Sequence, residues 1–167
     1  AKLGDKQAAR ETMISAGVPV IPGGDHAVYD EKDAKETAKK VGYPVMIKAV
    51  LGGGGKGMLT AKDEEEFVKN FAIAQAEAKQ SFGDDAMYIE HFITRPRHIE
   101  FQILADSYGN VIHLGERDCS IQRNHQKMIE EAPSAALSPE LRQRMGETAV
   151  RAAKAAGYVN AGTIEFL

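Results

Sequence analysis

The chain has 167 residues, of which 21 are Lys or Arg, 24 are Asp or Glu, and 43% are apolar. This ordinary globular composition excludes a disordered, collagen-like or coiled-coil chain. A net charge of −3 gives no overall basic field, which argues against a nucleic-acid binder and requires any anion site to be locally basic. Apolar stretches fall far short of the roughly 20 residues that span a membrane. Cys119 has no internal disulfide partner and the first residues lack an apolar secretory core, so we expect a cytoplasmic protein without membrane contact.

Three helices are predicted where an aspartate can cap the free N–H groups and a glycine follows the last turn. They are expected over residues 5–16, 30–41 and 63–82. A fourth helix is expected to begin at Ser138–Pro139 and to end at Gly157.

Runs of β-branched and aromatic residues between turn signals predict the strands. They are expected over residues 45–50, 58–61, 87–92, 98–105, 111–116 and 162–167, with an extended segment at 18–21. Because helices alternate with hairpins and not with single crossovers, the pattern predicts an α+β fold with mostly antiparallel sheets and flanking helices.

The most informative segment is a run of glycines at 52–55 that lies between Lys48 and Lys56. A loop without side chains lets backbone N–H groups converge on phosphate oxygens, and the two lysines supply positive charge. A Walker A motif is excluded because Gly57 follows Lys56, and no helix-opening dinucleotide fingerprint is present. The segment therefore predicts a phosphate-binding flap, with a flexible hairpin tip as the alternative.

Strict alternation from Arg97 to Ile103 predicts a strand with one apolar face and one polar face. His98, Glu100 and Gln102 share the polar face, which is either solvated or the wall of a cleft.

A long polar stretch, residues 116–127, follows an apolar strand. Its cations Arg123, His125 and Lys127 are suited to a polyanion or a carboxylate, with a solvated loop as the alternative. Cys119 has no partner at zinc-ligand spacing, so we expect it to serve packing and not a metal or a Cys119–His125 nucleophile pair.

Glu165 lies between Ile164 and Phe166, so on a strand it points away from the core. Such a carboxylate is either solvated or, if it faces bound phosphates, a ligand for Mg²⁺.

Taken in chain order, these segments resemble the biotin carboxylases of the ATP-grasp superfamily. The matching segments are residues 4–6, 16–19, 42–49, 52–58, 88–90, 96–102, 116–123, 125–127, 130–133 and 162–167. The resemblance implies an ATP-grasp fold in which residues 1–19 connect to an N-terminal domain, 20–92 form the small lobe, and 93–167 form the first part of the large lobe.

The same resemblance implies that ATP lies between the two lobes, with Lys6 and Lys48 on its phosphates and Glu90, with the backbone of His91 to Ile93, on the adenine edge. The flap that closes over the phosphates would comprise Gly53, Gly54, Gly55, Lys56, Gly57 and Met58.

For the large lobe, the resemblance places His98 and Gln122 near the ribose and phosphates and His125 near the γ-phosphate. Lys127 would meet bicarbonate or carboxyphosphate, and Glu165 would bind Mg²⁺, with Mn²⁺ as a substitute. Gln122, His125 and Lys127 are thus the expected catalytic residues.

The family reaction uses ATP and bicarbonate to form carboxyphosphate, whose carboxyl group passes to biotin on a carrier protein or domain. A carboxyltransferase then uses the carboxybiotin, for example in fatty acid biosynthesis, and a homodimer is expected for the parent enzyme.

The sequence departs from the family pattern at Val50–Leu51, where smaller residues are usual, and at His91, where lysine is common. The resemblance also implies that a Rossmann-like third precedes this segment and that the base for bicarbonate, a second metal carboxylate and the arginine beside biotin follow Leu167. We therefore expect this chain to bind ATP without completing the carboxylation.

Two alternatives differ in class. One is another ATP-grasp ligase, of the carbamoyl-phosphate or purine-pathway type, although the spacing of Gln122, His125 and Lys127 does not favour it. The other is a non-catalytic module that contacts a carrier domain without using a nucleotide.

Overall fold

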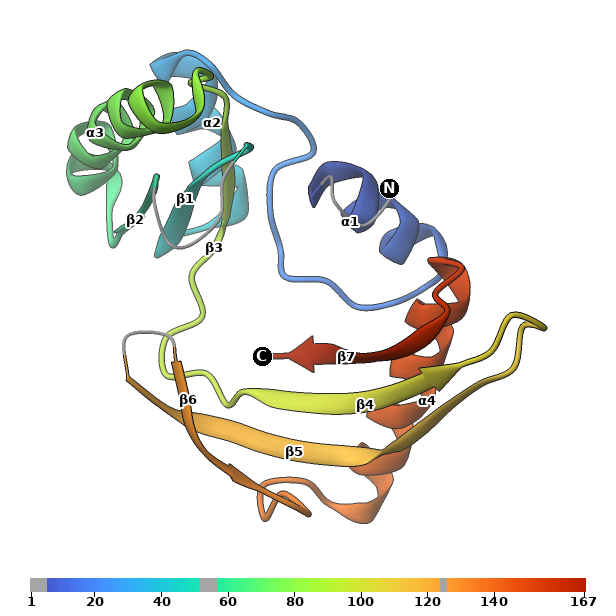
Figure 1. The fold of residues 1–167 in the computed structure, drawn as a ribbon. Coiled ribbons are helices and arrows are strands. Elements are labelled where there is room, and N and C mark those ends of the chain that lie inside the picture. The colour runs from blue at the N-terminus through green and yellow to red at the C-terminus, as the bar shows by residue number, and fades with distance from the viewer. Residues whose placement is uncertain (1–5, 52–56, 124–125) are drawn as a thin grey trace. The chain divides into compact units, whose positions relative to one another are not determined.

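The computed structural model describes residues 6–51, 57–123 and 126–167, and for Lys6 and Gln7 the backbone only (Figure 1). The chain divides into two compact units. Residues 21–94 form one, called here the inner unit. The described residues up to Val20 together with Arg95–Leu167 form the other, called the outer unit.

The inner unit is a three-stranded antiparallel sheet with two helices on one face. Its elements are α2 (Glu31–Val41), β1 (Val45–Ala49), β2 (Met58–Ala61), α3 (Glu64–Phe82) and β3 (Met87–His91), with strand order β2-β1-β3. The helices begin where the aspartates predicted them, since Asp30 accepts the N–H of Asp33 at 3.0 Å and Asp63 accepts the N–H of Glu66 at 2.9 Å. Gly83 ends α3 with a φ of +78°, which a residue without Cβ adopts without strain.

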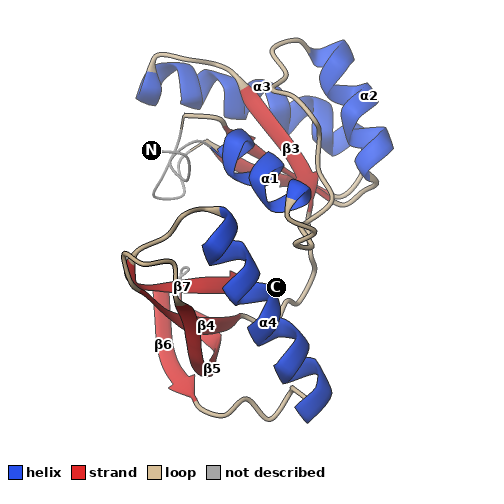
Figure 2. Cartoon of the chain, turned by 90° about the vertical axis from the view of Figure 1, so that its right-hand side faces the viewer, coloured by secondary structure: helices blue, strands red, loops and turns tan. Residues whose placement is uncertain are grey.

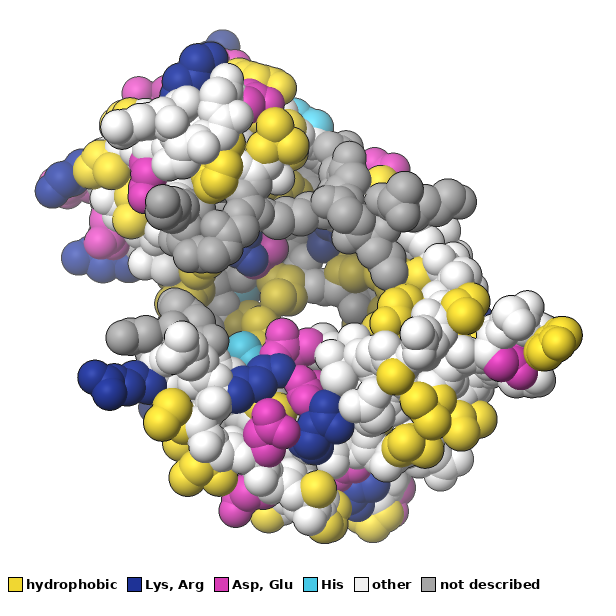
Figure 3. All heavy atoms as spheres, in the orientation of Figure 1, with side chains coloured by type: hydrophobic (Ala, Val, Ile, Leu, Met, Phe, Trp, Pro, Cys, Tyr) yellow, Lys and Arg dark blue, Asp and Glu magenta, His cyan; other side chains and the backbone are white. Residues whose placement is uncertain are grey.

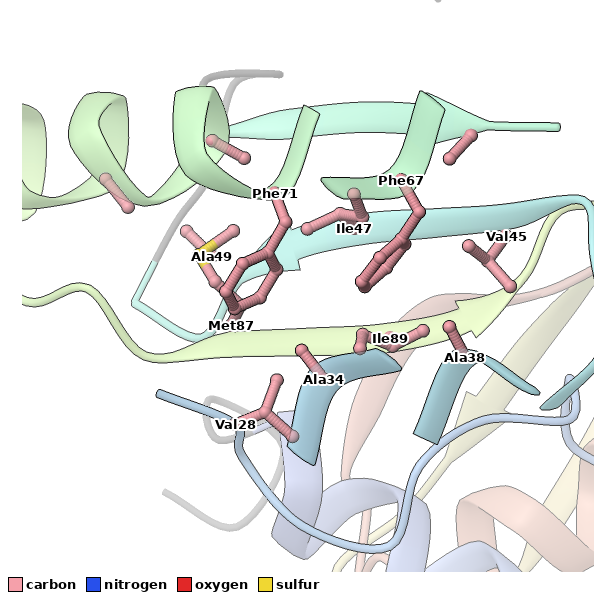
Figure 4. Close-up of a cluster of buried hydrophobic side chains, with 13 residues drawn as sticks. Val28, Ala34, Ala38, Val45, Ile47, Ala49, Phe67, Phe71, Met87 and Ile89 are labelled. Carbon is pink, nitrogen blue, oxygen red and sulfur yellow. The ribbon is translucent and has the colours of Figure 1, made fainter. Parts of the chain in front are cut away.

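The core of the inner unit lies between the sheet and its two helices (Figure 4). Alternate residues of β1 and β3 point into it, and Phe67 stacks on Phe71 with ring centroids 5.6 Å apart. Both rings are at most 2% exposed. Because successive strand residues face opposite ways, Lys48 and Glu90 lie on the face that α2 and α3 leave open.

The outer unit is a four-stranded antiparallel sheet with strand order β6-β5-β4-β7. Its elements are α1 (Lys6–Ser15), β4 (Ile99–Ala105), β5 (Val111–Arg123), β6 (Gln126–Glu131), α4 (Pro139–Ala155) and β7 (Asn160–Phe166). Helix α4 lies across one face of this sheet (Figure 2) and packs on Ile99, Phe101 and Ile103. The alternation predicted for this strand is confirmed, since these three side chains are at most 3% exposed.

The α+β prediction is confirmed, and the structure corrects two of its details. Strand β5 runs on past Glu116 to Arg123, and β6 occupies part of the stretch for which a solvated loop was the alternative. Polarity concealed the end of β5, where Asp118 is buried at 7% exposure, and it concealed β6, whose residues are all exposed. Asp118 accepts Ser134 Oγ at 3.0 Å, and this partner offsets the cost of burying its charge.

None of the helices in the described part of the chain has the length and apolarity that crossing a membrane requires.

The stacked rings of the inner unit make a direct test of its core. Phe67→Ala removes a fully buried ring and should lower the free energy of unfolding by about 3–5 kcal/mol. The control is Ile73→Ala on the same helix, where the side chain is 49% exposed and the change should stay within about 0.5 kcal/mol. Urea unfolding curves measure both, and equal losses would contradict this description of the core.

Candidate functional site

A lysine and a glutamate meet on the open face of the inner sheet. Lys48 on β1 donates through Nζ to Oε1 of Glu90 on β3. The register sets Lys48 opposite Tyr88 and Glu90 opposite Met46, so the two charged side chains are diagonal neighbours on one face. Their side chains are 24% and 17% exposed, and the ion pair is therefore largely shielded from water.

The β1–β2 hairpin brings the far end of the predicted flap next to Lys48. Met58 is the register partner of Lys48, and Ala49 donates its N–H to the carbonyl of Gly57 at 2.9 Å. Gly57 has a φ of +65°, and a Cβ there would lie 3.0 Å from that of Ala49, so glycine is required. The other predicted flap residues, Gly53, Gly54, Gly55 and Lys56, lie outside the described residues.

The backbone after β3 leaves one donor available. The N–H of His91 donates to the carbonyl of Pro22 at 2.7 Å, and the N–H of Phe92 donates to the carbonyl of Pro44 at 2.8 Å. Within the described residues the N–H of Ile93 has no such partner. Of the three N–H groups in the segment predicted to meet adenine, only that of Ile93 can therefore serve a ligand without breaking an internal bond.

A buried carboxylate, Glu100, organises the open face of the outer sheet. Its side chain is only 5% exposed. Arg117 on β5 donates to Glu100 Oε1 through Nε at 2.7 Å and also through Nη2. Lys127 on β6 donates through Nζ to the other oxygen, Oε2. The two oxygens thus receive two different cations.

The charges in this cluster hold one another ionised. Burial alone would raise the pKa of Glu100, but the hydrogen bonds from Lys127 and Arg117 outweigh it and leave that pKa below its usual value. The bond to Glu100, with a smaller contribution from Glu165, raises the pKa of Lys127 well above its ordinary value of 10.5, against the effect of burial. Lys127 is therefore an ammonium at any physiological pH.

Three further predicted residues lie in the neighbourhood of Lys127 on the same sheet. Glu165 on β7 places Oε1 at 3.0 Å from Lys127 Nζ and 3.5 Å from Nδ1 of His98, which immediately precedes β4. Gln122 is the register partner of Lys127 and donates through Nε2 to the carbonyl of Cys119 at 2.9 Å. The structure thus gathers four predicted residues, while His125 and the side chain of Lys6 lie outside the described part of the chain.

The resulting surface alternates in charge. Figure 3 shows basic and acidic side chains side by side, with a histidine nearby, over the region where Figure 1 draws the outer sheet. Among the described residues, Glu100, Cys119 and Glu130 bring donor atoms to within 4.8 Å of one another. Burial, and then Glu100, raise the pKa of the Cys119 thiol, and cations already occupy Glu100, so this trio is unsuited to a metal. Cys119 is fully buried, as expected for a packing residue.

No site role was predicted for Glu100 or Arg117 from the sequence. The signal was present, because Glu100 shares the polar face of its strand with His98, and Arg117 lies in the polar stretch. The sequence alone does not show that β4 pairs with β5, and this pairing sets Glu100 opposite Arg117.

Comparisons with known proteins place this geometry in a family. Residues 5–167 match the family model "Carbamoyl-phosphate synthase L chain, ATP binding domain". The chain belongs to this family. It is 61% identical over 165 residues to a biotin carboxylase of Nostoc sp. and 54% identical over 166 residues to biotin carboxylase 1 of Bacillus subtilis. Each alignment covers 99% of this chain and 37% of the relative, so the chain spans little more than a third of these proteins.

Solved structures give the same result for the fold. A biotin carboxylase from Campylobacter jejuni, described as a complex with β,γ-ATP, matches with a TM-score of 0.90 and 54% identity over 97% of this chain and 36% of that one. The biotin carboxylase domain of Hydrogenobacter thermophilus 2-oxoglutarate carboxylase, described as a dimer with MgADP and bicarbonate, matches with a TM-score of 0.90 and 52% identity, covering 99% of this chain and 36% of that one. The ATP-grasp fold and the resemblance to biotin carboxylases are confirmed.

The cluster predicts how stability depends on pH. Because the pKa of Glu100 is depressed, its ion pairs stabilise the fold above the carboxyl's ordinary pKa of 4.5, and this stabilisation is lost as the pH falls through the lower folded value. Glu100→Gln should therefore cost about 2–3 kcal/mol at pH 7 and progressively less below about pH 4.

Urea unfolding at pH 7 and pH 3.5 measures this difference. The matched control is Glu64→Gln, which also removes a carboxylate between two cations, Lys35 and Lys39, but at an exposed position where water screens the pairs and a much smaller change is expected. A loss for Glu100→Gln that is the same at both pH values would contradict the proposed charge state.

Proposed function

We propose that this chain is the nucleotide-binding portion of a biotin carboxylase, in which ATP and bicarbonate are used to carboxylate biotin on a carrier protein or domain. One observation carries the proposal, namely that the chain matches biotin carboxylases over 99% of its length. In keeping with it, Lys127, whose pKa is raised, lies beside the half-exposed carboxylate of Glu165. In this proposal residues 20–92 are the small lobe and residues 93–167 belong to the large lobe.

In the inner unit, Lys48 would bind the phosphates and Glu90 would lie near the adenine. Because these two side chains hold each other in the structure described here, ATP must exchange the carboxylate on Lys48 for phosphate oxygens. The free N–H of Ile93 and the carbonyl of His91 would then meet the adenine edge, and the flap around Gly57 would cover the phosphates.

The donor set of Glu165 fits a divalent cation. Its Oε1 faces Lys127 and His98, its Oε2 has no partner among the described residues, and the side chain is 47% exposed. Mg²⁺ is commonly held by one or two carboxylates together with phosphate oxygens, and Mn²⁺ has similar preferences. When bound, such an ion would neutralise charge on the phosphates during transfer.

The residues of the outer unit would bind bicarbonate, the ribose and the phosphates. Because its pKa is raised, Lys127 would attract bicarbonate and stabilise carboxyphosphate through its positive charge. Gln122 and His98 would orient the ribose and phosphates, and His125 the γ-phosphate. Biotin on its carrier would receive the carboxyl group and deliver it to a carboxyltransferase.

The assembly and compartment of the whole protein are also proposals. A homodimer is supported by the relative from Hydrogenobacter thermophilus, whose biotin carboxylase domain is described as a dimer. The cytoplasm is proposed because the chain has a single, buried cysteine, which is in keeping with a reducing compartment.

Isothermal titration of the chain with MgATP tests the nucleotide role. Lys48→Met removes a charge-assisted contact and should weaken binding by about 10–100-fold, which corresponds to about 1.5–3 kcal/mol. Lys69→Met removes an exposed lysine from α3 and should bind MgATP like the unaltered chain. Equal affinities for both variants, or no binding of MgATP by the unaltered chain, would overturn the proposal.

A further inference from the structure

A glutamine next to the charged cluster ties it to the backbone of β7. Gln102 lies two residues after Glu100 on the same face of β4. Its Nε2 donates to the carbonyl of Gly162 at 2.9 Å, and its Oε1 accepts Nη1 of Arg117 at 3.2 Å. The amide group is thus oriented at both ends, because only one of its two orientations offers an oxygen to the arginine.

Arg117 is in turn fixed by three partners. Besides Gln102, it contacts Glu100 through Nε and Nη2, and its Nε lies 3.3 Å from Oε2 of Glu130. A guanidinium held in this way has a defined plane, and two of its nitrogens, Nε and Nη2, both donate to Oε1 of Glu100. The other carboxylate oxygen, Oε2, is left for Lys127.

These contacts form one line across all four strands of the outer sheet. It runs from the carbonyl of Gly162 on β7 through Gln102, Arg117 and Glu100 to Lys127 on β6. Lys127 then returns to β7 through Glu165. The flexible lysine side chain, which is only 32% exposed, thereby acquires a fixed acceptor at its tip.

We propose that Gln102 and Arg117 are positioning residues which, through Glu100, hold the ammonium of Lys127 in one place on the open face of the outer sheet. The proposal rests on the proposed function in one respect, namely that the anion which meets Lys127 is bicarbonate or carboxyphosphate. Such control matters because a displacement of about 1 Å at a group that contacts a reacting anion can cost about 100-fold in rate.

The reactivity of Lys127 separates positioning from a merely structural role. Acetic anhydride reacts with the free amine, which must first leave its ion pair with Glu100, so the labelling rate reports how firmly that contact holds the Lys127 side chain in place. Labelling at pH 8 followed by peptide mass spectrometry gives the rate for each lysine. Lys39, which pairs with Glu64 in the inner unit, is the internal reference.

Glu100→Gln removes the acceptor and should raise the labelling rate of Lys127 at least about tenfold relative to Lys39. Gln102→Leu keeps the volume of the side chain but frees Arg117, and should raise that rate at least about threefold. Arg117→Lys retains the positive charge but loses the planar set of donors, so it should also raise the labelling rate of Lys127. The matched control is Gln143→Leu on α4, where the lost partner is the exposed Glu147 and no change is expected.

The proposal is overturned if Lys127 is labelled at the unaltered rate in both Gln102→Leu and Arg117→Lys. It is also overturned if Lys127 and Lys39 accelerate together, since that reports general loosening of the fold. Calorimetry with MgATP on the same proteins tests the proposed function separately from the positioning role. Selective acceleration at Lys127 in a chain that does not bind MgATP would sustain the positioning role and overturn the nucleotide role.

Discussion

Within the described part of each unit, helices cover only one face of the sheet, and the chemistry of the chain follows from that constraint. Period-two alternation sends apolar side chains to the covered face and polar side chains to the open one. In the inner unit, Ile47 and Ile89 face the helices while Lys48 and Glu90 face away. The burial that stabilises each unit therefore also places the charged residues of that unit, in fixed register, on the open face of its own sheet.

On the outer sheet, this arrangement buries a charged group, the carboxylate of Glu100. A carboxylate as buried as Glu100 is stable only with strong partners, and Arg117 and Lys127 supply them. The same ion pairs keep Lys127 protonated. A folding requirement and a functional property thus share one set of contacts: the charge that the buried carboxylate needs for stability is the charge that the proposed site presents to its anionic substrate.

Local signals were enough to predict much of the fold from the sequence. Helix starts at Asp30 and Asp63 depend on contacts within three residues, and they were predicted correctly. The end of β5 and the whole of β6 were not, because their residues are polar and only contacts distant in sequence make them strands: Asp118 accepts Ser134 Oγ, and β6 pairs with β5. For the site, residue types and order predict Lys48, Lys127 and Glu165, but they do not predict the contacts of Glu100, which depend on strand pairing.

We expect the open face of the outer sheet to present Glu165 and Lys127 to a metal-bound anion. Paramagnetic broadening by Mn²⁺ reports on this arrangement, in amide NMR spectra of the isotopically labelled chain with ATP present. Signals around Glu165 should broaden in the unaltered chain and should stay sharp in Glu165→Gln, because a carboxylate is the ligand that the ion needs there. Equal broadening in both proteins would show that the ion binds elsewhere and that Glu165 is no metal ligand.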